Sequence, residues 1–304
     1  MSWTACEQPT VLMKLHRNTI YVEDAVVLSH VAHPGNQFTL RVQAPQCAAH
    51  ARPGSFAHLS CDPLLPMRRP LSIMRTDPRQ GWVEFLYKAL GVGLRLLAQR
   101  EVGESLSMMG PIGVSYTLHP DKPRPLLIGG GVGIPPMVFV ADVLRQSNES
   151  YHPFVIMGSE VPFPFTARPS RVMTPGMPDG VIASMPLLEE WGIASRLASL
   201  QGYPGCFEGY VTELARAYLT ALNPEQRAEV EIFACGPTAM LEAVAKLARE
   251  FRLPCQVSLE EYMACAVGGC AGCVVEVQTP QGPAMKRVCV DGPVFDAATI
   301  ASFA

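Results

Sequence analysis

The stretch PLLIGGGVGIPPMVFVA, residues 125–141, is the part of the sequence from which the fold can be deduced first. Its four glycines and three prolines disfavour a continuous helix. A membrane-spanning helix would need about 20 apolar residues, so we expect no membrane span. We interpret Leu126–Ile128 as a buried strand, Gly129–Gly133 as a turn and Pro135–Gln146 as a helix.

A glycine turn between a strand and a helix is typical of a phosphate-binding site, because free N–H groups and the helix dipole favour an anion there. The strict spacing G-x-G-x-x-G is not present, so a plain tight turn remains the alternative. The candidate nucleotide-binding residues of this turn are Gly129, Gly131 and Gly133.

Strands and helices continue to alternate after this stretch, which predicts a parallel sheet. The segments that resemble further strands are Pro153–Met157 and Glu231–Ala234, and those that resemble helices are Thr212–Leu222 and Pro237–Phe251. Together they predict an α/β nucleotide-binding domain over residues 122–255. We assign no structure to Val161–Ser199, which is rich in proline and methionine.

The tripeptide Cys235-Gly236-Pro237 follows one of these strands and begins a helix. In doubly wound sheets, ligands gather at the carboxyl ends of the strands. We therefore consider Cys235, Gly236 and Pro237 candidate cofactor-binding residues, with the thiol facing a nicotinamide ring. The alternative is a packed cysteine at the end of a strand.

Residues 20–121 contain short strands such as Ile20–Leu28, Phe38–Val42 and Trp82–Tyr87, which predict a β-barrel or a sandwich. The arginine of RPLS, residues 69–72, can bind a diphosphate in a bidentate way, and the serine hydroxyl can reach a flavin ring edge. Tyr87 can stack on an aromatic ring. The candidate cofactor-binding residues in this part are Arg69, Pro70, Leu71, Ser72, Leu86, Tyr87, Lys88, Gly93 and Leu94.

Four cysteines near the C-terminus have the spacing C-x4-C-x2-C, followed after fifteen residues by a fourth cysteine. This is the plant-type spacing for a [2Fe–2S] cluster. Glycines within the loop allow the backbone to approach the cluster. A structural zinc site and buried free thiols are the alternatives, although the x4 gap is unusual for zinc. The candidate metal ligands, in a short domain over residues 256–304, are Cys265, Cys270, Cys273 and Cys289.

The composition excludes several classes of protein. The 304 residues are 48% hydrophobic and 17% charged, which excludes global disorder, and the net charge of −3 makes nucleic acid an unlikely partner. The N-terminal segment Met1–Lys14 does not resemble a secretory signal, so we expect a cytoplasmic protein with reduced thiols. The cysteines outside the cluster motif are scattered at Cys6, Cys47, Cys61, Cys206, Cys235 and Cys255.

Taken together, these motifs resemble the ferredoxin–NADP reductase superfamily, and within it the electron-transfer subunits of NAD-linked dihydroorotate dehydrogenase. The resemblance extends from Ile20 to Phe295. It rests on five motifs in the family's order, which are Arg69–Ser72, Gly91–Leu94, Gly129–Pro136, Cys235–Pro237 and Cys265–Asp291. Two features differ from the family pattern: Leu94 replaces a threonine, and Val161–Ser199 is longer than expected.

The resemblance implies a three-part α+β fold with a flavin-binding barrel, a nucleotide-binding domain and a short [2Fe–2S] domain. It implies FAD, a [2Fe–2S] cluster and NAD(H) as cofactors, and an FMN-containing dihydroorotate dehydrogenase catalytic subunit as partner, in a heterotetramer of pyrimidine biosynthesis. About fifty residues follow Cys255, whereas oxygenase reductases carry a ferredoxin domain of about a hundred, a usual single-domain size. This difference favours the dihydroorotate dehydrogenase family.

A relay of electrons follows from the cofactors. Nicotinamide exchanges a hydride and the cluster carries one electron, so the flavin must stand between them. No catalytic residue for dihydroorotate is assigned here, because a (β/α)8 barrel alone takes about 250 residues. Glu160 favours NAD(H) over NADP(H), because an acidic side chain repels a 2′-phosphate. The alternatives are a ferredoxin- or hydrogenase-type NAD(P)H reductase subunit and a zinc-binding interaction protein without redox activity.

Overall fold

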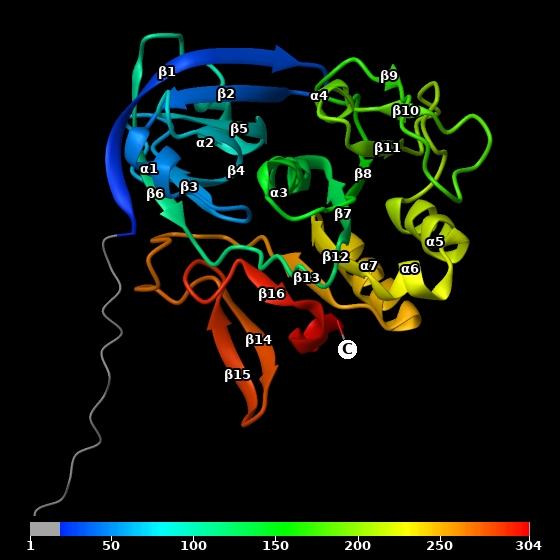
Figure 1. Cartoon of the computed structure of the whole chain (residues 1–304). Coiled ribbons are helices and arrows are strands. Elements are labelled where there is room, and N and C mark those ends of the chain that lie inside the picture. Colours follow the sequence, from blue (N-terminus) through cyan, green and yellow to red (C-terminus); the bar gives the residue numbers. More distant parts are fainter. Residues whose placement is uncertain (1–18, 304) are drawn as a thin grey trace, which may run out of the picture.

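The computed structural model describes residues 19–303, and its first part is a closed β-barrel (Figure 1). Closure leaves no free strand edge in this part of the protein. Two short helices, α1 (Pro45–His50) and α2 (Gly91–Leu97), pack beside the barrel. In the order in which they pair, its strands are β1 (Tyr21–His33), β2 (Gln37–Gln43), β5 (Trp82–Lys88), β4 (Arg69–Asp77), β3 (Phe56–Leu59) and β6 (Ser105–Ile112).

The second part is a six-stranded sheet in which only the last strand is antiparallel. The glycine-rich segment of the sequence forms β7 and the start of the helix α3 (Ile134–Gln146), which lies between the sheet and the barrel (Figure 1). In order, the strands are β11 (Ala194–Ala198), β8 (Phe154–Gly158), β7 (Arg124–Gly130), β12 (Val230–Cys235), β13 (Cys255–Ser258) and β16 (Val294–Asp296).

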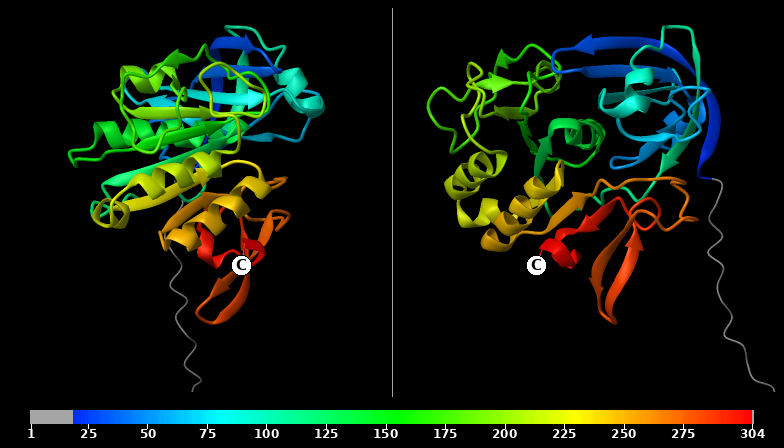
Figure 2. Two further views of the ribbon diagram at one scale, coloured as in Figure 1. Left: turned by 90° about the vertical axis from the view of Figure 1, so that its right-hand side faces the viewer. Right: turned by 180° about the vertical axis from the view of Figure 1, so that it is seen from behind.

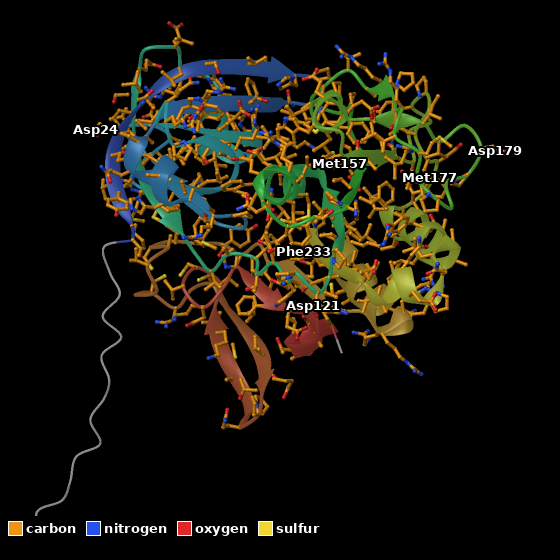
Figure 3. The ribbon with its side chains drawn as sticks, viewed as in Figure 1. Asp24, Asp121, Met157, Met177, Asp179 and Phe233 are labelled. Carbon is orange, nitrogen blue, oxygen red and sulfur yellow. The ribbon has the colours of Figure 1, made fainter. Side chains whose placement is uncertain are left out.

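Helices cover both faces of this sheet because its strands are apolar on both sides. Leu126 and Ile128 of β7 pack with α5 (Val211–Ala221) and α7 (Thr238–Phe251). Leu127 points to the other face and packs with α3. Met157 of β8 and Phe233 of β12 lie in this second core, and Figure 3 shows them in the interior near α3. A short helix α6 (Pro224–Ala228) precedes β12.

After β13 the C-terminal part leaves the central sheet, forms the cysteine segment and a hairpin, and then returns to the sheet. Its hairpin, β14 (Val274–Thr279) and β15 (Gly282–Arg287), projects from the body of the molecule (Figure 2). The chain then adds β16 beside β13 and ends in two 3-10 turns, η2 (Ala297–Thr299) and η3 (Ala301–Phe303). The predicted division at residues 20–121, 122–255 and 256–304 stays a proposal, since β13 and β16 tie the last segment to the central sheet.

The stretch Val161–Ser199 forms short elements rather than a free loop. They are β9 (Arg168–Pro169), β10 (Ala183–Ser184), α4 (Pro186–Glu190) and the edge strand β11. Their apolar side chains enter the core beside α3. No helix among residues 19–303 is long and apolar enough to cross a membrane. Cys6 lies outside the described residues.

Candidate functional site

The glycine turn and the Cys-Gly-Pro segment come together at the carboxyl ends of β7 and β12. The two strands are parallel neighbours, and Gly129 is the register partner of Cys235. A Cβ atom on Gly133 would lie 2.2 Å from the carbonyl oxygen of Cys235, so only glycine fits there. The two predicted nucleotide-binding segments therefore form one backbone cradle, with Gly131 in a left-handed conformation (φ +55°) at its rim.

Cys235 is fully buried at this point, between β7 and β13, where Ser258 is its register partner. Burial and the nearby charge of Glu260 raise the pKa of its thiol, so the cysteine is neutral at physiological pH. The side chain packs in the core between the central sheet and the barrel. A neutral thiol at this position can pack beside a bound ring, whereas a nucleophilic cysteine would need to be a thiolate.

The flavin motif is brought together in the same way, from two segments that are far apart in sequence. The Arg69 guanidinium lies directly over Gly93, where a Cβ atom would be 3.0 Å from Nε. Arg69 also donates to the carbonyl groups of Met67 and Arg68, at 2.8 and 3.0 Å. A guanidinium beside the backbone of Gly93 is a donor set suited to a diphosphate. Leu94 follows on α2 without a hydroxyl.

The candidate cofactor-binding residues of strand β5 face two different cores. Leu86 is buried toward α3, whereas Tyr87 points into the barrel. The Tyr87 ring is 1% exposed, stacks on Phe38 with 5.5 Å between centroids, and bonds through its hydroxyl to His30 at 2.8 Å. Tyr87 is thus a barrel core residue with no face left for a flavin. Pro70, Leu71, Ser72 and Lys88 lie along β4 and at the end of β5.

The four predicted ligand cysteines form two pairs. The amide of Cys270 donates to Sγ of Cys265 at 3.4 Å, and the Cys270 side chain also contacts that thiol. The side chains of Cys273 and Cys289 contact each other and are buried. The charge of Cys265 also contributes to raising the pKa of Cys289, so the two pairs lie close together.

This paired arrangement suits a binuclear cluster. In a [2Fe–2S] cluster each iron takes two thiolates, whereas zinc takes four ligands around a single ion. The donor set therefore fits two irons better than one zinc.

Amide groups of the cysteine loop point at the sulfurs. Although burial opposes it, hydrogen bonds from the amides of Val267 and Cys270 lower the pKa of the Cys265 thiol to about 7. Gly268 has φ +77°, and a Cβ there would lie 2.9 Å from Val290. In contrast, burial and its contact with Cys273 raise the pKa of Cys289 to about 12.

An ion pair closes the segment that carries the fourth cysteine. Arg287 Nε lies 3.0 Å from an Asp291 carboxylate oxygen, which also accepts from the Arg287 amide at 2.8 Å. The same guanidinium donates to the carbonyl of Gly268 at 3.2 Å. These bonds join the first loop to the turn around Cys289, so they connect the two segments that carry the cysteines.

The cysteine segment rests directly on the barrel. Phe56 of β3 and Ile112 of β6 share one buried group with Cys273 and Cys289. The amide of Val114 donates to the carbonyl of Gly292 at 2.6 Å. Strand β3 also pairs with β4, where Phe56 is the register partner of Ser72 in the RPLS motif. The predicted cluster ligands and the predicted flavin motif are therefore neighbours in space.

Sequence reasoning missed one residue in this region, His58 of β3. It is 1% exposed, and within residues 19–303 neither of its ring nitrogens has a hydrogen-bond partner. Burial and the charges of Arg68 and Arg69 lower its pKa to about 4, although the carbonyl groups of Arg68 and Met263 act in the opposite direction. A lone histidine on a short strand matches no motif, and only the fold places it beside the flavin motif.

Comparison with known proteins supports this picture. Residues 260–301, which contain all four paired cysteines, match the family of the iron-sulfur cluster binding domain of dihydroorotate dehydrogenase B. The dihydroorotate dehydrogenase B (NAD(+)) electron transfer subunit of Desulforamulus reducens is 32% identical over 278 residues, 90% of this chain and 96% of the relative. That of Geobacillus kaustophilus is 33% identical over 257 residues, 82% and 86% of the two chains.

The chain belongs to this family of electron transfer subunits. The resemblance expected from the order of the motifs is confirmed. Membership of the dihydroorotate dehydrogenase B electron transfer subunits extends over nearly the whole chain, not only the cysteine segment, and it implies a catalytic subunit as partner.

Solved structures confirm the fold class. A chain from the NADH-dependent reduced ferredoxin-NADP oxidoreductase structure has a TM-score of 0.73 at 24% identity and covers 91% of this chain and 90% of its own. Phthalate dioxygenase reductase has a TM-score of 0.55 at 14% identity, covering 88% and 77%. The dihydroorotate dehydrogenase B family member described here thus has the expected three-part α+β fold.

Proposed function

We propose that the chain is the electron-transfer subunit of a dihydroorotate dehydrogenase B in pyrimidine biosynthesis. It would take electrons from the FMN of a catalytic partner subunit, in a heterotetramer, and deliver them through a [2Fe–2S] cluster and FAD to NAD+. The observation that carries the proposal is the packing of Cys273 and Cys289 against Phe56, whose register partner is Ser72 of the RPLS motif. That contact would give the two cofactors adjacent sites within one chain.

Bound FAD would supply the change between the single electrons of a cluster and the hydride of a nicotinamide. The chain's own residues bind and orient. Arg69 and the backbone of Gly93 would hold the diphosphate of FAD, with Ser72 and Leu86 near its ring. The cradle of Gly129, Gly131, Gly133, Gly236 and Pro237 would hold the nucleotide, with neutral Cys235 packed behind it.

We propose NAD(H) as the nucleotide substrate. Glu160 is exposed directly after β8, the parallel neighbour of β7, at the same edge of the sheet as the glycine turn. A carboxylate there would accept hydrogen bonds from ribose hydroxyls and repel a 2′-phosphate. We also propose a cytoplasmic location, since the nine described cysteines outside residues 1–18 are all free thiols.

The first experiment asks whether the chain holds the cofactors. The purified chain is reconstituted anaerobically with iron, sulfide and FAD, and its absorption and EPR spectra are recorded. We expect flavin and [2Fe–2S] bands with about two irons per chain. A colourless protein that retains zinc would overturn the redox function and support the zinc-binding alternative.

The second experiment asks for the partner. The reconstituted chain is mixed with a dihydroorotate dehydrogenase catalytic subunit from the same genome, and NAD+ reduction is followed with dihydroorotate as donor. We expect NADH to form only when both subunits are present. NADH formation with a reduced ferredoxin but not with this mixture would instead indicate a ferredoxin-type reductase subunit.

A further inference from the structure

The buried histidine of β3 occupies the junction between the flavin motif and the cysteine loop. His58 is the register partner of Pro70 on β4 and of Met109 on β6. Pro70 belongs to the RPLS motif, whereas Met109 packs against the buried group that contains Cys273 and Cys289. His58 therefore lies between β4, which carries the proposed flavin motif, and β6, which packs against the proposed cluster ligands.

The surroundings of the ring are polar but incompletely paired. Met263, two residues before Cys265, packs against the same buried group as Met109. Its main-chain carbonyl and that of Arg68, just before β4, approach the ring. Among residues 19–303, neither carbonyl meets the geometry of a hydrogen bond and no other group pairs with the ring nitrogens. A buried imidazole without a partner is costly, since the loss of its hydrogen bonds to water is not repaid.

The carbonyls of Arg68 and Met263 differ in their other hydrogen bonds. The carbonyl of Arg68 already accepts from Arg69 at 3.0 Å. Arg68 itself is anchored on β6 through Ser107, whose carbonyl accepts at 2.7 Å and whose hydroxyl accepts at 2.8 Å. The barrel side of the junction is thus fixed. The Met263 side belongs to the loop that leads into the cysteines, and a small shift of that loop would complete a bond.

We propose that His58 is a positioning residue, which holds the loop before Cys265 against the flavin motif by donating a ring N–H to the carbonyl of Met263. The inference deepens the proposed function and rests on it. At physiological pH the ring is neutral and carries one N–H, because its pKa is about 4. This single N–H can bond one of the two carbonyls. The carbonyl of Arg68 already accepts a hydrogen bond from Arg69, whereas that of Met263 does not.

The consequence concerns the gap between cluster and flavin. Electron transfer slows steeply as the distance between two redox centres grows, so a loosened loop would slow the step without removing either cofactor. Arg287 restrains the loop at Gly268, whereas Tyr262 is 94% exposed and Cys270 is exposed. His58 would restrain the loop at Met263, on the side that faces the barrel.

Two variants of the reconstituted chain test the assignment. His58→Phe keeps a ring of similar size but removes the donor, and His58→Gln keeps a donor. His152→Phe is the control, because His152 is exposed and far from both motifs in the sequence. Hydrogen–deuterium exchange of residues 259–273 is measured first. The EPR spectrum of the reduced cluster is then recorded, and the rate of electron transfer from cluster to flavin is followed after rapid mixing with a reductant.

We expect His58→Phe to raise the exchange rate of this loop about tenfold, the effect of losing one hydrogen bond, and to broaden the EPR signal. Transfer from cluster to flavin should slow, while the iron and FAD contents stay unchanged. His58→Gln should restore most of each readout, and His152→Phe should match the wild type. A His58→Phe protein with wild-type exchange, EPR and transfer rate would overturn the proposal.

The measurements distinguish a wrong function from a wrong role for His58. If the wild-type chain binds neither iron nor flavin, the proposed function itself is wrong. If the wild type binds both and His58→Phe only lowers the melting temperature, with wild-type exchange in residues 259–273, then His58 is merely a core residue and the positioning role is overturned.

Discussion

Single residues at the candidate sites act mainly through contacts with distant backbone. Arg69 lies over Gly93 although the two are 24 positions apart in the sequence. We expect Arg69→Ala to weaken FAD binding about 10- to 100-fold, since a hydrogen bond to a charged group contributes about 1.5–3 kcal/mol. Flavin fluorescence titration of the apoprotein measures this effect.

The control for this change is Arg79→Ala, which removes an exposed arginine from the same barrel. It should leave FAD affinity within twofold of the wild type, as is usual for surface substitutions (about 0.5 kcal/mol). Equal losses in both variants would mean that Arg69 acts only through the general charge of the barrel.

Gly133 marks the closest approach of the two nucleotide-binding segments. In Gly133→Ala the new methyl group would lie 2.2 Å from the carbonyl oxygen of Cys235, so β7 and β12 must move apart at their ends. We expect a loss of about 1–3 kcal/mol in stability and a much weaker binding of NADH. Calorimetric titration with NADH measures the latter, and unchanged iron content shows that the rest of the chain is folded. Wild-type NADH affinity would contradict this use of the turn.

Burial of His58 also predicts a pH dependence of stability. Its pKa is lowered from 6.5 to about 4 in the folded chain, so the unfolded chain binds the proton first as the pH falls. The folded state is therefore favoured fully above about pH 6.5 and loses this advantage as the pH falls toward 4. Between pH 7 and 4.5 the wild type should lose roughly 2–3 kcal/mol more than His58→Phe.

Urea unfolding of the cofactor-free wild type and His58→Phe at several pH values measures this difference. Parallel pH profiles for the two proteins would show that the imidazole is accessible to protons in the folded chain. His152→Phe, which alters an exposed histidine, should follow the wild-type profile.

At the scale of elements, long periodic segments were predictable and short ones were not. The helix predicted at Pro237–Phe251 is observed as α7, and the strand predicted at Leu126–Ile128 is the centre of β7. Strand β3 has only four residues, all buried, and shows no alternation that a sequence pattern can reveal. The stretch Val161–Ser199 was unreadable because its elements of two to five residues depend on the packing of its apolar side chains beside α3.

The hairpin β14–β15 lies between the third and fourth cysteines of the predicted cluster motif. An isolated two-stranded hairpin is marginal in water, and a bound metal centre contributes to folding. We expect Cys289→Ser to lose the cluster and to make residues 259–293 sensitive to protease, while the barrel and the central sheet resist cleavage. Iron analysis and limited proteolysis followed by mass spectrometry measure both effects.

Cys206→Ser provides the matched control, because Cys206 is a free thiol far from the cysteine pairs in sequence and packs beside α3. It should keep both iron and protease resistance. A Cys289→Ser protein that retained a full [2Fe–2S] spectrum would exclude Cys289 as a ligand.

At the scale of the whole molecule, residues 19–303 form a closed barrel and a mostly parallel sheet, and no (β/α)8 barrel lies among them. The barrel and the central sheet account for most of residues 19–303, and a (β/α)8 barrel would need about 250 more. We expect the reconstituted single chain to reduce an artificial dye with NADH but to show no turnover of dihydroorotate. Steady-state assays with each donor measure this, and dihydroorotate turnover by the single chain would refute it.

The sequence alone determined the family and the fold class and predicted the cysteines of the cluster, because these depend on local spacing and on the order of the motifs. The tertiary structure decided which motif residues meet. Closure of the barrel turned Tyr87 inward onto Phe38, parallel pairing brought Gly133 to Cys235, and the return of the chain to the sheet set the cysteines beside β3. The role inferred for His58 follows from such packing between segments distant in sequence, which no local pattern of residues encodes.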